Sequence, residues 1–181
     1  MSEDDRLRWE ERYQSLPPLR ADDIGLPAPF RPFADLLPRS GTALELACGR
    51  GTAAVWLAQQ GLTVHAYDVS PAAVEAARAL AGSTGCQQRC RIAVADLDHG
   101  LPPGDTVDVL LCSMFRAPPL YGAMIDRVAR GGLLAVSVLS EVDAAPGRYR
   151  APAGELTRAF TGLDVIAAGE GDGQAWLLGR R

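Results

Sequence analysis

Short apolar runs alternate with stretches of helical periodicity from residue 42 to the end of the chain. Apolar runs of about four to eight residues are typical of buried strands, whereas apolar positions three and four apart are typical of one helix face. Because the two patterns alternate, we expect a parallel sheet covered by helices on both faces. The pattern predicts strands at 42–47, 62–67, 90–95, 107–112, 133–139, 164–168 and 174–179, and helices at 52–60, 71–81, 121–130 and 155–160.

Turn and capping residues mark where several of these elements begin and end. Gly61 follows the first helix, and Ser70-Pro71 supplies an N-cap and a first helical proline for the second. Gly131-Gly132 follows the third helix. Only the segment GEGDG separates the last two strands. A crossover helix does not fit into so short a connection, so these two strands should form an antiparallel hairpin.

The N-terminal part of the chain follows a different pattern. Residues 1–20 predict a short charged helix that carries Trp9 and Tyr13 on one face and is stopped by Pro17-Pro18. The proline-rich stretch that follows predicts a loop with one short helix at 33–37. The sequence leaves open whether this part only packs on the rest of the protein or closes over a ligand as a lid. We therefore expect an N-terminal helical or lid segment, 1–39, and a ligand-binding domain, 40–181.

The composition narrows the function without naming it. A chain of 181 residues with 48% hydrophobic residues fits a single domain with a sizeable core. Its formal net charge of −4 offers no general attraction to nucleic acid or to anionic lipid, so we expect neither as a partner. All 18 Lys and Arg positions are arginine, which fits a bacterial protein from a high-GC genome. Without lysine the chain cannot form a Schiff base, anchor pyridoxal phosphate or build a Walker A phosphate loop.

Neither a membrane span nor a secretion signal is visible in the sequence. The apolar stretches are shorter than the roughly 18 residues of a membrane span, and the N-terminus MSEDDRLRWEERY is acidic and lacks an apolar core. We therefore expect a cytoplasmic protein whose four cysteines, Cys48, Cys86, Cys90 and Cys112, are free thiols. The spacing of Cys86 and Cys90, in a chain with only two histidines, does not favour a zinc site, so we predict no metal.

Candidate chemistry gathers at the predicted carboxyl ends of the strands, where ligands bind in such sheets. Gly49, Gly51 and Ala54 fit the dinucleotide fingerprint G-x-G-x-x-G/A, in which glycines let the backbone approach a ligand. Asp68 follows the second strand and can accept two hydrogen bonds from a ribose diol. Asp96 follows the third strand and can accept a bond from an adenine amino group, while the amide of Leu97 donates to a ring nitrogen. Each residue alone also fits a tight turn, a loop carboxylate or a helix cap. Their joint arrangement favours an adenosine-containing ligand.

Both NAD and S-adenosylmethionine contain adenosine, and three features separate them. Glu45 lies four residues before Gly49, where a carboxylate suits the ammonium of a methionine moiety and is unfavourable beside a pyrophosphate. Ala54 is a weaker match than glycine at the helix-packing position of a pyrophosphate site. The length leaves no room for the second substrate domain that hydride-transfer enzymes usually carry. The residues favour S-adenosylmethionine.

Several segments together resemble a known family. ELACGRG, AYDVS, VADLD, VDVLLCSMF and VARGGLLAVSVL resemble, in this order, the successive motifs of class I S-adenosylmethionine-dependent methyltransferases. The tail YRAPAGELTRAFTGLDVIAAGEG, and Trp9, Arg12 and Tyr13 near the start, are similar to segments of small bacterial members, the tellurite-resistance and thiopurine methyltransferases. The chain departs from the pattern at Ala47, which replaces the first glycine of the first motif. It also has Ser113-Met114-Phe115-Arg116 where Asn/Asp-Pro-Pro-Tyr marks enzymes that methylate nucleobases or protein glutamine.

The resemblance implies a Rossmann-like, doubly wound α/β fold with a seven-stranded sheet in the order 3-2-1-4-5-7-6, strand 7 antiparallel. It implies S-adenosylmethionine as cofactor and S-adenosylhomocysteine as product, in a monomer or homodimer that methylates oxygen, sulfur, nitrogen or a metalloid of a small molecule. A protein that only binds this cofactor, and an NAD-dependent enzyme, are the alternatives. The family's cofactor contacts fall on Glu45, Ala47, Cys48, Gly49, Gly51, Asp68, Val69, Asp96, Leu97 and Ser113. For the acceptor side we consider Trp9, Tyr13, Met114, Phe115, Arg116, Tyr121 and Tyr149.

None of the side chains is an obvious catalytic base, so we assign no catalytic residue. His65 lies within the second predicted strand, His99 lies beyond Asp98, and lysine is absent. Methyl transfer is an in-line displacement at a carbon that the sulfonium already activates, so alignment of the reacting atoms supplies most of the catalysis. We therefore expect an acceptor that ionises by itself, such as a thiol, a phenol or a hydroxylated heterocycle.

Overall fold

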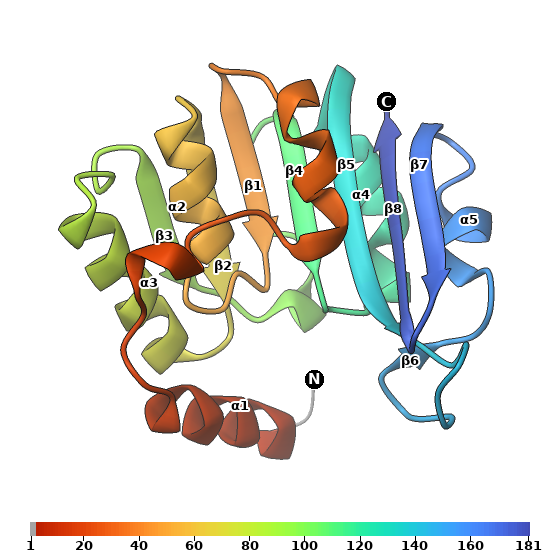
Figure 1. Ribbon diagram of the computed structural model, residues 1–181, viewed down its shortest axis with the longest axis horizontal. Coiled ribbons are helices and arrows are strands. Elements are labelled where there is room, and N and C mark those ends of the chain that lie inside the picture. The colour runs from red at the N-terminus through yellow and green to blue at the C-terminus, as the bar shows by residue number, and fades with distance from the viewer. Residues whose placement is uncertain (1–2) are drawn as a thin grey trace. The chain divides into compact units, whose positions relative to one another are not determined.

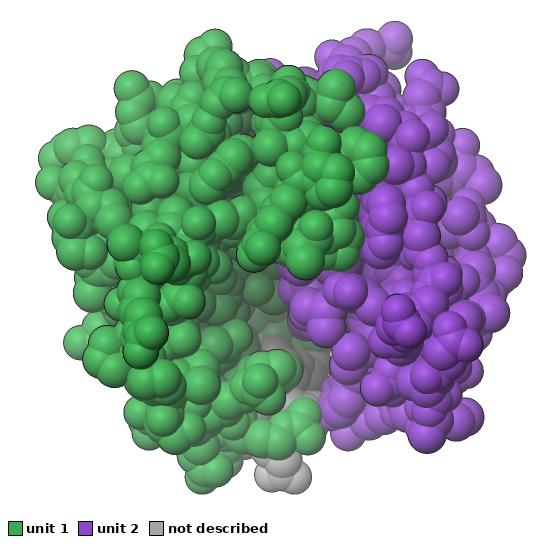
Figure 2. All heavy atoms as spheres, in the orientation of Figure 1, with its two compact units in different colours: residues 1–102 green, residues 103–181 purple. Residues whose placement is uncertain are grey.

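The computed structural model describes residues 3–181, and the predicted helical positions 1 and 2 lie outside the described residues. The chain divides into two compact units, residues 1–102 and residues 103–181 (Figure 2). We call them unit 1 and unit 2 and describe each by itself. The predicted boundary between residues 39 and 40 stays a prediction.

Unit 1 is built on three parallel strands in the order β3-β2-β1 (Figure 1). Thr42 pairs with Thr63 and Val64 pairs with Cys90, so the strands run in step and their carboxyl ends lie at one edge. Helices α2 and α3 pack on these strands, and α1 packs on α3. The elements are α1 (Glu3–Ser15), η1 (Ala21–Asp23), η2 (Ala28–Leu36), β1 (Thr42–Leu46), α2 (Thr52–Gln59), β2 (Thr63–Asp68), α3 (Pro71–Ser83), β3 (Cys90–Val94) and η3 (Leu97–His99), the η elements being 3₁₀ helices.

Unit 2 combines a parallel strand pair with an antiparallel hairpin. β4 and β5 are parallel, whereas β8 pairs antiparallel with both β5 and β7. Helix α4 packs on β5 and α5 packs on β8. The elements are β4 (Val107–Ser113), η4 (Pro118–Leu120), α4 (Tyr121–Arg127), β5 (Val128–Ser140), β6 (Arg150–Ala151), α5 (Glu155–Ala159), β7 (Asp164–Gly171) and β8 (Gln174–Arg180).

The strand order confirms the predicted fold class. It reads β3-β2-β1-β4-β5-β8-β7, which is the expected 3-2-1-4-5-7-6 once the short extra strand β6 is set aside. The predicted hairpin of the last two strands is present, and β8 is its strand that runs antiparallel to β5. Ser70 caps α3 as predicted, because its hydroxyl accepts a hydrogen bond from the amide of Ala73 at 3.1 Å.

Four element predictions were wrong in detail, and one short strand was missed. The strand predicted at 133–139 begins at Val128 and ends at Ser140. The helix predicted at 121–130 ends at Arg127, because Val128 is fully buried and pairs with Val107 at the start of β5. The strand predicted at 164–168 continues to Gly171. The short helix expected at 33–37 is a 3₁₀ helix that begins at Ala28 and contains a proline. β6 was not predicted, since its two residues are too few for any pattern; they pair with the end of β5.

The buried side chains follow the strand pattern. In unit 1, β2 alternates between buried and partly exposed residues, and its buried positions meet the apolar faces of α2 and α3. In unit 2, the centre of β4 is buried on both faces, as expected for a strand inside a sheet. Among residues 3–181, the longest apolar helices are too short to cross a membrane. Most of the functional candidates lie at the carboxyl ends of the strands or on the loops that follow them.

Candidate functional site

The turn between β1 and α2 is tightly wound. Three alternate residues, Ala47, Gly49 and Gly51, have left-handed backbones with φ of 52°, 53° and 75°. The amide of Cys48 donates to the carbonyl of Tyr67 at 2.9 Å and so fixes the turn to the end of β2. For a residue with a side chain, the left-handed conformation costs about 1–2 kcal/mol. Ala47, the position where the family pattern has glycine, therefore keeps the glycine conformation under strain.

The two glycines of the turn have neighbours that explain why a side chain does not fit. A Cβ on Gly51 would lie 2.7 Å from the Cβ of Ala77, so Gly51 lets the start of α2 pack against α3. A Cβ on Gly49 would lie 2.9 Å from the hydroxyl oxygen of Tyr13. The sequence assigned both glycines to a ligand. The structure gives Gly51 a packing role and brings an aromatic residue of α1 to Gly49.

Asp68 holds the same turn from the end of β2. Its carboxylate accepts hydrogen bonds from the amide of Gly49 at 2.8 Å and from the amide of Ser70 at 3.0 Å. The residue is only 5% exposed, and burial raises the pKa of its carboxyl group, although these amides partly offset the effect. One oxygen is used by each amide. Since a carboxylate oxygen can accept more than one bond, the hydroxyls of a ribose can still be accommodated.

Glu45 lies buried at the end of β1, beneath the turn. The residue is 5% exposed, and the amide of Ala54 donates a hydrogen bond to its carboxylate. Its Oε2 atom has no hydrogen-bond partner within residues 3–181. Burial raises the pKa of Glu45 to about 8, the Ala54 amide opposes this, and the charge of Asp68 adds to it. An enclosed carboxyl oxygen without a partner is suited to a cationic ligand group, so the residues fit the ammonium of S-adenosylmethionine.

Helix α1 is anchored to this turn by polar contacts that the sequence did not reveal. The carboxylate of Glu10 accepts hydrogen bonds from the hydroxyl of Ser70 at 2.5 Å and from the amide of Ala72 at 3.1 Å. The bond from Ser70 lowers the pKa of Glu10, which burial opposes. The guanidinium of Arg50 donates to the carbonyl of Pro17 at 2.5 Å. Glu10 lies three residues before Tyr13, on the same helical face, and this spacing was the signal that could have identified it.

The predicted aromatic pair lies on the docked part of α1. The rings of Trp9 and Tyr13 stack with their centroids 5.8 Å apart. The guanidinium of Arg12 lies 5.3 Å from the centre of the Trp9 ring. Burial, together with the charge of Asp68, raises the pKa of the Tyr13 hydroxyl, so this hydroxyl stays protonated. Tyr13 thus lies at the predicted cofactor turn within unit 1, and its role toward an acceptor stays a prediction.

Asp96 lies in the loop after β3, as predicted. Its side chain accepts a hydrogen bond from the amide of Asp98 at 2.9 Å and caps the short helix η3. Leu97 beside it is 5% exposed, and Val69 after β2 is partly exposed. The cap was the structural alternative to adenine binding. Asp96 caps η3 with one carboxylate oxygen, and the predicted adenine contact stays a prediction.

Unit 2 contributes the loop after β4. The hydroxyls of Ser113 and Ser137 lie 2.8 Å apart, and the amide of Met114 donates to the carbonyl of Ser137 at 2.7 Å. Met114 has a left-handed backbone with φ of 59°, and its side chain is 49% exposed. Phe115, which follows, is partly exposed. Strained, exposed residues after a strand are often functional, so Met114 and Phe115 remain candidates for the acceptor side.

Arg116 forms an ion pair with Glu155 within unit 2. Its guanidinium makes a two-pronged contact with the carboxylate of Glu155, with Nε at 2.8 Å from Oε1 and Nη2 at 2.5 Å from Oε2. The hydroxyl of Tyr121 also donates to Glu155 at 2.8 Å. Burial raises the pKa of Glu155, but these bonds outweigh it and the net pKa is lowered. Tyr149, by contrast, is 42% exposed, with Arg148 over its ring. The clamp among Glu155, Arg116 and Tyr121 was not predicted.

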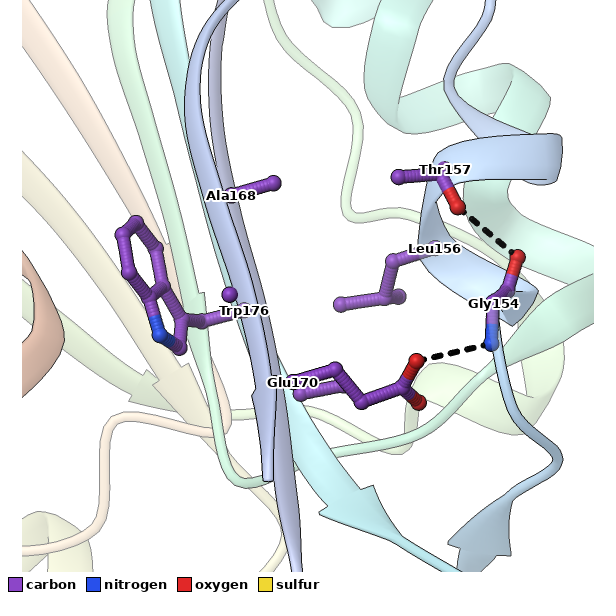
Figure 3. A pocket seen from close by; sticks show the side chains of 8 residues that line it. Gly154, Leu156, Thr157, Ala168, Glu170 and Trp176 are labelled. Atoms are coloured by element: carbon purple, nitrogen blue, oxygen red, sulfur yellow. Dashed lines mark hydrogen bonds between the residues drawn. The ribbon is translucent and has the colours of Figure 1, made fainter. Parts of the chain in front are cut away.

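A pocket of about 190 Å³ lies elsewhere in unit 2, between α5 and the β7–β8 hairpin (Figure 3). Leu156 and Thr157 face the hairpin, whereas the Trp176 ring points to its other side (Figure 3). The Glu170 carboxylate accepts bonds from Ser140 and from the amide of Gly154, and the Thr157 hydroxyl donates to Gly154. Because these polar groups are already paired, and no predicted site residue lines the pocket, we do not assign it to the chemistry.

Comparisons with known proteins agree with the observed fold. Residues 43–131 match the sequence family described as "Methyltransferase domain". No curated protein is detectably similar in sequence. Among solved structures, TehB from Haemophilus influenzae superposes with a TM-score of 0.78 at 15% identity, over 96% of this chain and 67% of that chain.

Two further structures resemble the chain over most of their own length. A TehB-like SAM-dependent methyltransferase from Corynebacterium glutamicum has a TM-score of 0.69 at 15% identity, over 99% of this chain and 100% of that chain. An S-adenosylmethionine dependent methyltransferase from Mesorhizobium loti has a TM-score of 0.69 at 18% identity, over 85% of this chain and 98% of that chain. The chain therefore contains a segment that matches a methyltransferase domain, in the fold of these structures, and this confirms the predicted enzyme class. The predicted cofactor, S-adenosylmethionine, is the one that the names of the last two structures give for those proteins.

Proposed function

We propose that this protein, a methyltransferase with S-adenosylmethionine as its cofactor, methylates a small acceptor that ionises without help from the enzyme. The observation that carries this proposal is the set of three carboxylates around one glycine turn. Asp68 accepts a hydrogen bond from the amide of Gly49 in the turn, and Glu45 accepts one from the amide of Ala54 in α2. Glu10 accepts one from the hydroxyl of Ser70 at the start of α3. The charges of Glu10 and Asp68 attract the sulfonium and ammonium of S-adenosylmethionine, and the Glu45 carboxyl group can pair with the ammonium once it ionises.

The same carboxylates argue against an NAD-dependent enzyme. A pyrophosphate carries negative charge, and like charges at a buried site are unfavourable. The enclosed Oε2 of Glu45 would then gain no partner. The second alternative, a protein that binds the cofactor without transferring its methyl group, shares this half of the site. Only a transfer measurement separates it from an enzyme.

We assign roles to the residues as follows. The ammonium would meet Glu45, the ribose would meet Asp68, and the adenine would lie between Val69 and the loop of Asp96 and Leu97. The turn residues Ala47, Cys48, Gly49 and Gly51 would face the methionine part. Ser113 of unit 2 is the residue that the resemblance to the family assigns to the sulfonium. When bound, the cofactor supplies a methyl group that its positive sulfur makes electrophilic. The chain's own task is to hold the acceptor in line with that methyl group.

For the acceptor side we retain Met114, Phe115 and Tyr149, which are exposed or partly exposed in unit 2. Arg116 and Tyr121 are held by Glu155, so we propose that they shape this side rather than bind an anion. His65 lies within β2, and the side chain of His99 is 84% exposed. Neither imidazole is placed as a buried base, which supports an acceptor that is acidic by itself, such as a thiol, a phenol or a hydroxylated heterocycle.

We further propose that α1 acts as a lid over the cofactor turn, and the contacts of Tyr13 with Gly49 and of Glu10 with Ser70 support this role. A lid would keep water from the reacting methyl group. Cys48, Cys86 and Cys90 are free thiols, which supports a reducing compartment such as the cytoplasm. We propose a monomer or homodimer without a nucleic-acid partner, on the net charge of −4.

The acceptor class can be tested with a panel. Purified protein and S-adenosylmethionine are incubated with small thiols, phenols, hydroxylated heterocycles, amines and metalloid oxyanions, and formation of S-adenosylhomocysteine is measured. We expect turnover with acceptors of the first three classes, rising with pH as each acceptor ionises. His65→Ala and His99→Ala should retain it. A loss beyond about a hundredfold in either variant, with cofactor affinity intact, would indicate a general base and contradict the proposal.

A further inference from the structure

We propose that Glu45 holds a proton in the cofactor-free protein and gives it up when the ammonium group of S-adenosylmethionine binds, so that cofactor binding releases a proton to solvent near neutral pH. The inference rests on the cofactor assignment made above and goes beyond it, because it concerns how the site changes its protonation. The starting observation is the enclosed carboxyl group of Glu45, whose Oε2 atom has no hydrogen-bond partner among residues 3–181.

The surroundings of Glu45 favour its neutral form. The residue is 5% exposed, and only the amide of Ala54 is known to donate to it, since Oε2 lacks a partner among residues 3–181. The ionisable groups that sense its charge are Asp68 at the end of β2, the Cys48 thiol in the turn and the Cys90 thiol on β3. All of these are acids. An isolated carboxylate is costly to bury, so such a group takes up a proton instead.

The pKa of the Glu45 carboxyl group agrees with this environment. Burial raises the pKa of Glu45 to about 8. At pH 7 a group with such a pKa is about 90% protonated. Asp68 differs, because each of its oxygens accepts a backbone amide, and this favours its charged form. Of the two buried acids at the turn, Glu45 therefore has fewer of the contacts that keep a carboxylate ionised, since one amide donates to it and at least two donate to Asp68.

An ammonium group would reverse the preference. A positive charge within about 4–6 Å favours the ionised carboxylate, typically by one to three pKa units. The O–H bond of Glu45 then breaks, its electron pair stays on the carboxylate, and the proton passes to a solvent base. The ammonium keeps its three protons and pairs with the new charge. S-adenosylhomocysteine carries the same ammonium and should release the same proton, whereas 5′-methylthioadenosine lacks it and should release none.

The experiment is calorimetric titration at pH 7 in two buffers with different ionisation enthalpies, which yields the number of protons released per ligand. We expect about 0.4 to 0.9 proton for S-adenosylmethionine and for S-adenosylhomocysteine, depending on how far the ammonium lowers the pKa, and close to zero for 5′-methylthioadenosine. Glu45→Gln should bind both cofactors with the release reduced to near zero. The matched control is Glu75→Gln, at an exposed acid on α3, which should release as the wild type does.

The outcomes separate the possible failures. Binding of S-adenosylmethionine with no proton release, or a release that Glu45→Gln leaves intact, would overturn this inference alone. No binding of either cofactor would overturn the cofactor assignment and the inference with it. If Glu45→Gln does not fold, the wild-type protein carries the test with S-adenosylhomocysteine, because its release should fall toward zero as the pH rises from about 7 to about 9. A release that stays constant over this interval would contradict the proposal.

Discussion

The hydroxyl oxygen of Tyr13 lies so close to Gly49 that a Cβ at Gly49 would be 2.9 Å from it. The contact joins α1 to the turn in which we place the methionine end of the cofactor. It explains why a helix that is mostly charged and partly exposed stays at this edge of unit 1: one aromatic ring and one carboxylate, that of Glu10, hold it. Because of this contact, the packing role of Gly49 can be tested without any ligand.

Gly49→Ala should destabilise the protein for two reasons that can be separated. The left-handed backbone costs a residue with a side chain about 1–2 kcal/mol, and the new methyl group collides with Tyr13. In a Tyr13→Ala background only the backbone part remains, so the loss of unfolding free energy should be smaller. Denaturant unfolding of the wild type, both single variants and the double variant measures this difference. Equal losses in the two backgrounds would show that Tyr13 does not rest on Gly49.

Glu10→Gln should loosen α1 while leaving the fold intact. A neutral amide replaces the charged acceptor of the Ser70 and Ala72 bonds, and hydrogen bonds to a charged group are worth about 1.5–3 kcal/mol. We expect faster hydrogen exchange in residues 3–15, little change in the melting temperature, and slower methyl transfer. Glu11→Gln, at an exposed neighbour on the same helix, is the control.

Deletion of residues 1–20 tests the lid more severely. Transfer should then fall much more than the melting temperature does, because the helix is needed for shielding the methyl group and less for the core. If both quantities fell in proportion, α1 would be ordinary packing and not a lid.

Ala47→Gly should stabilise the protein, in contrast to most glycine substitutions. Ala47 has φ of 52°, and glycine relieves the strain of that conformation. We expect a gain of up to about 1 kcal/mol in unfolding free energy, after the entropy that glycine adds to the unfolded chain. Ala53→Gly within α2 is the matched control and should lose about 1 kcal/mol. A loss at both positions would indicate that the turn is not strained at Ala47.

The stability of the protein should fall between about pH 5 and pH 8. The folded state keeps a proton on Glu45 up to a pKa of about 8, whereas the unfolded chain releases it near about 4.3. Unfolding therefore releases a proton in this interval, and a rise in pH favours the unfolded state by up to about 1.4 kcal/mol per pH unit. The contribution is complete below about pH 4.3 and is lost as pH passes 8.

Glu45→Gln isolates this effect, since glutamine does not titrate. The difference in unfolding free energy between wild type and variant should slope downward with pH from about 5 to 8. Asp68, whose pKa is also raised by burial, acts in the same direction in both proteins and cancels in the difference. A flat difference would mean that Glu45 is ionised in the folded protein.

Glu155→Gln should destabilise unit 2 at neutral pH. It weakens the bonds from Arg116 and Tyr121, and the side chains of Arg116 and Glu155 are only 25% and 15% exposed, so we expect a loss of about 1–3 kcal/mol. Because the pKa of Glu155 is lowered in the folded state, its contribution is present above about pH 4.3 and is lost as pH falls through the folded value. The deficit of the variant should therefore shrink in acid. Asp164→Asn, at an exposed acid on β7, is the control, and an equal loss there would contradict the role of the clamp.

The sequence predicted the features that depend on local pattern, which are the strands and several helix ends. The alternation of apolar runs placed the strands within a few residues, and Ser70-Pro71 and Gly61 marked helix ends that the structure keeps. It could not predict contacts between distant residues. The bond between Glu10 and Ser70 and the clamp on Glu155 each join positions more than thirty residues apart. For the same reason the sequence could not predict that Gly51 lies against Ala77 on another helix.

The central claim is that the turn of Gly49, Glu45 and Asp68 holds S-adenosylmethionine for methyl transfer. Its most direct test is a single-turnover reaction with cofactor labelled in the methyl group and an acceptor from the panel, in wild type and in Asp68→Asn. We predict one labelled methyl group in the acceptor for each S-adenosylhomocysteine formed. The variant, which loses charge-assisted bonds to the ribose, should bind the cofactor at least about tenfold more weakly. Tight binding of the cofactor with no label in any acceptor, or an unchanged affinity in Asp68→Asn, would contradict the account.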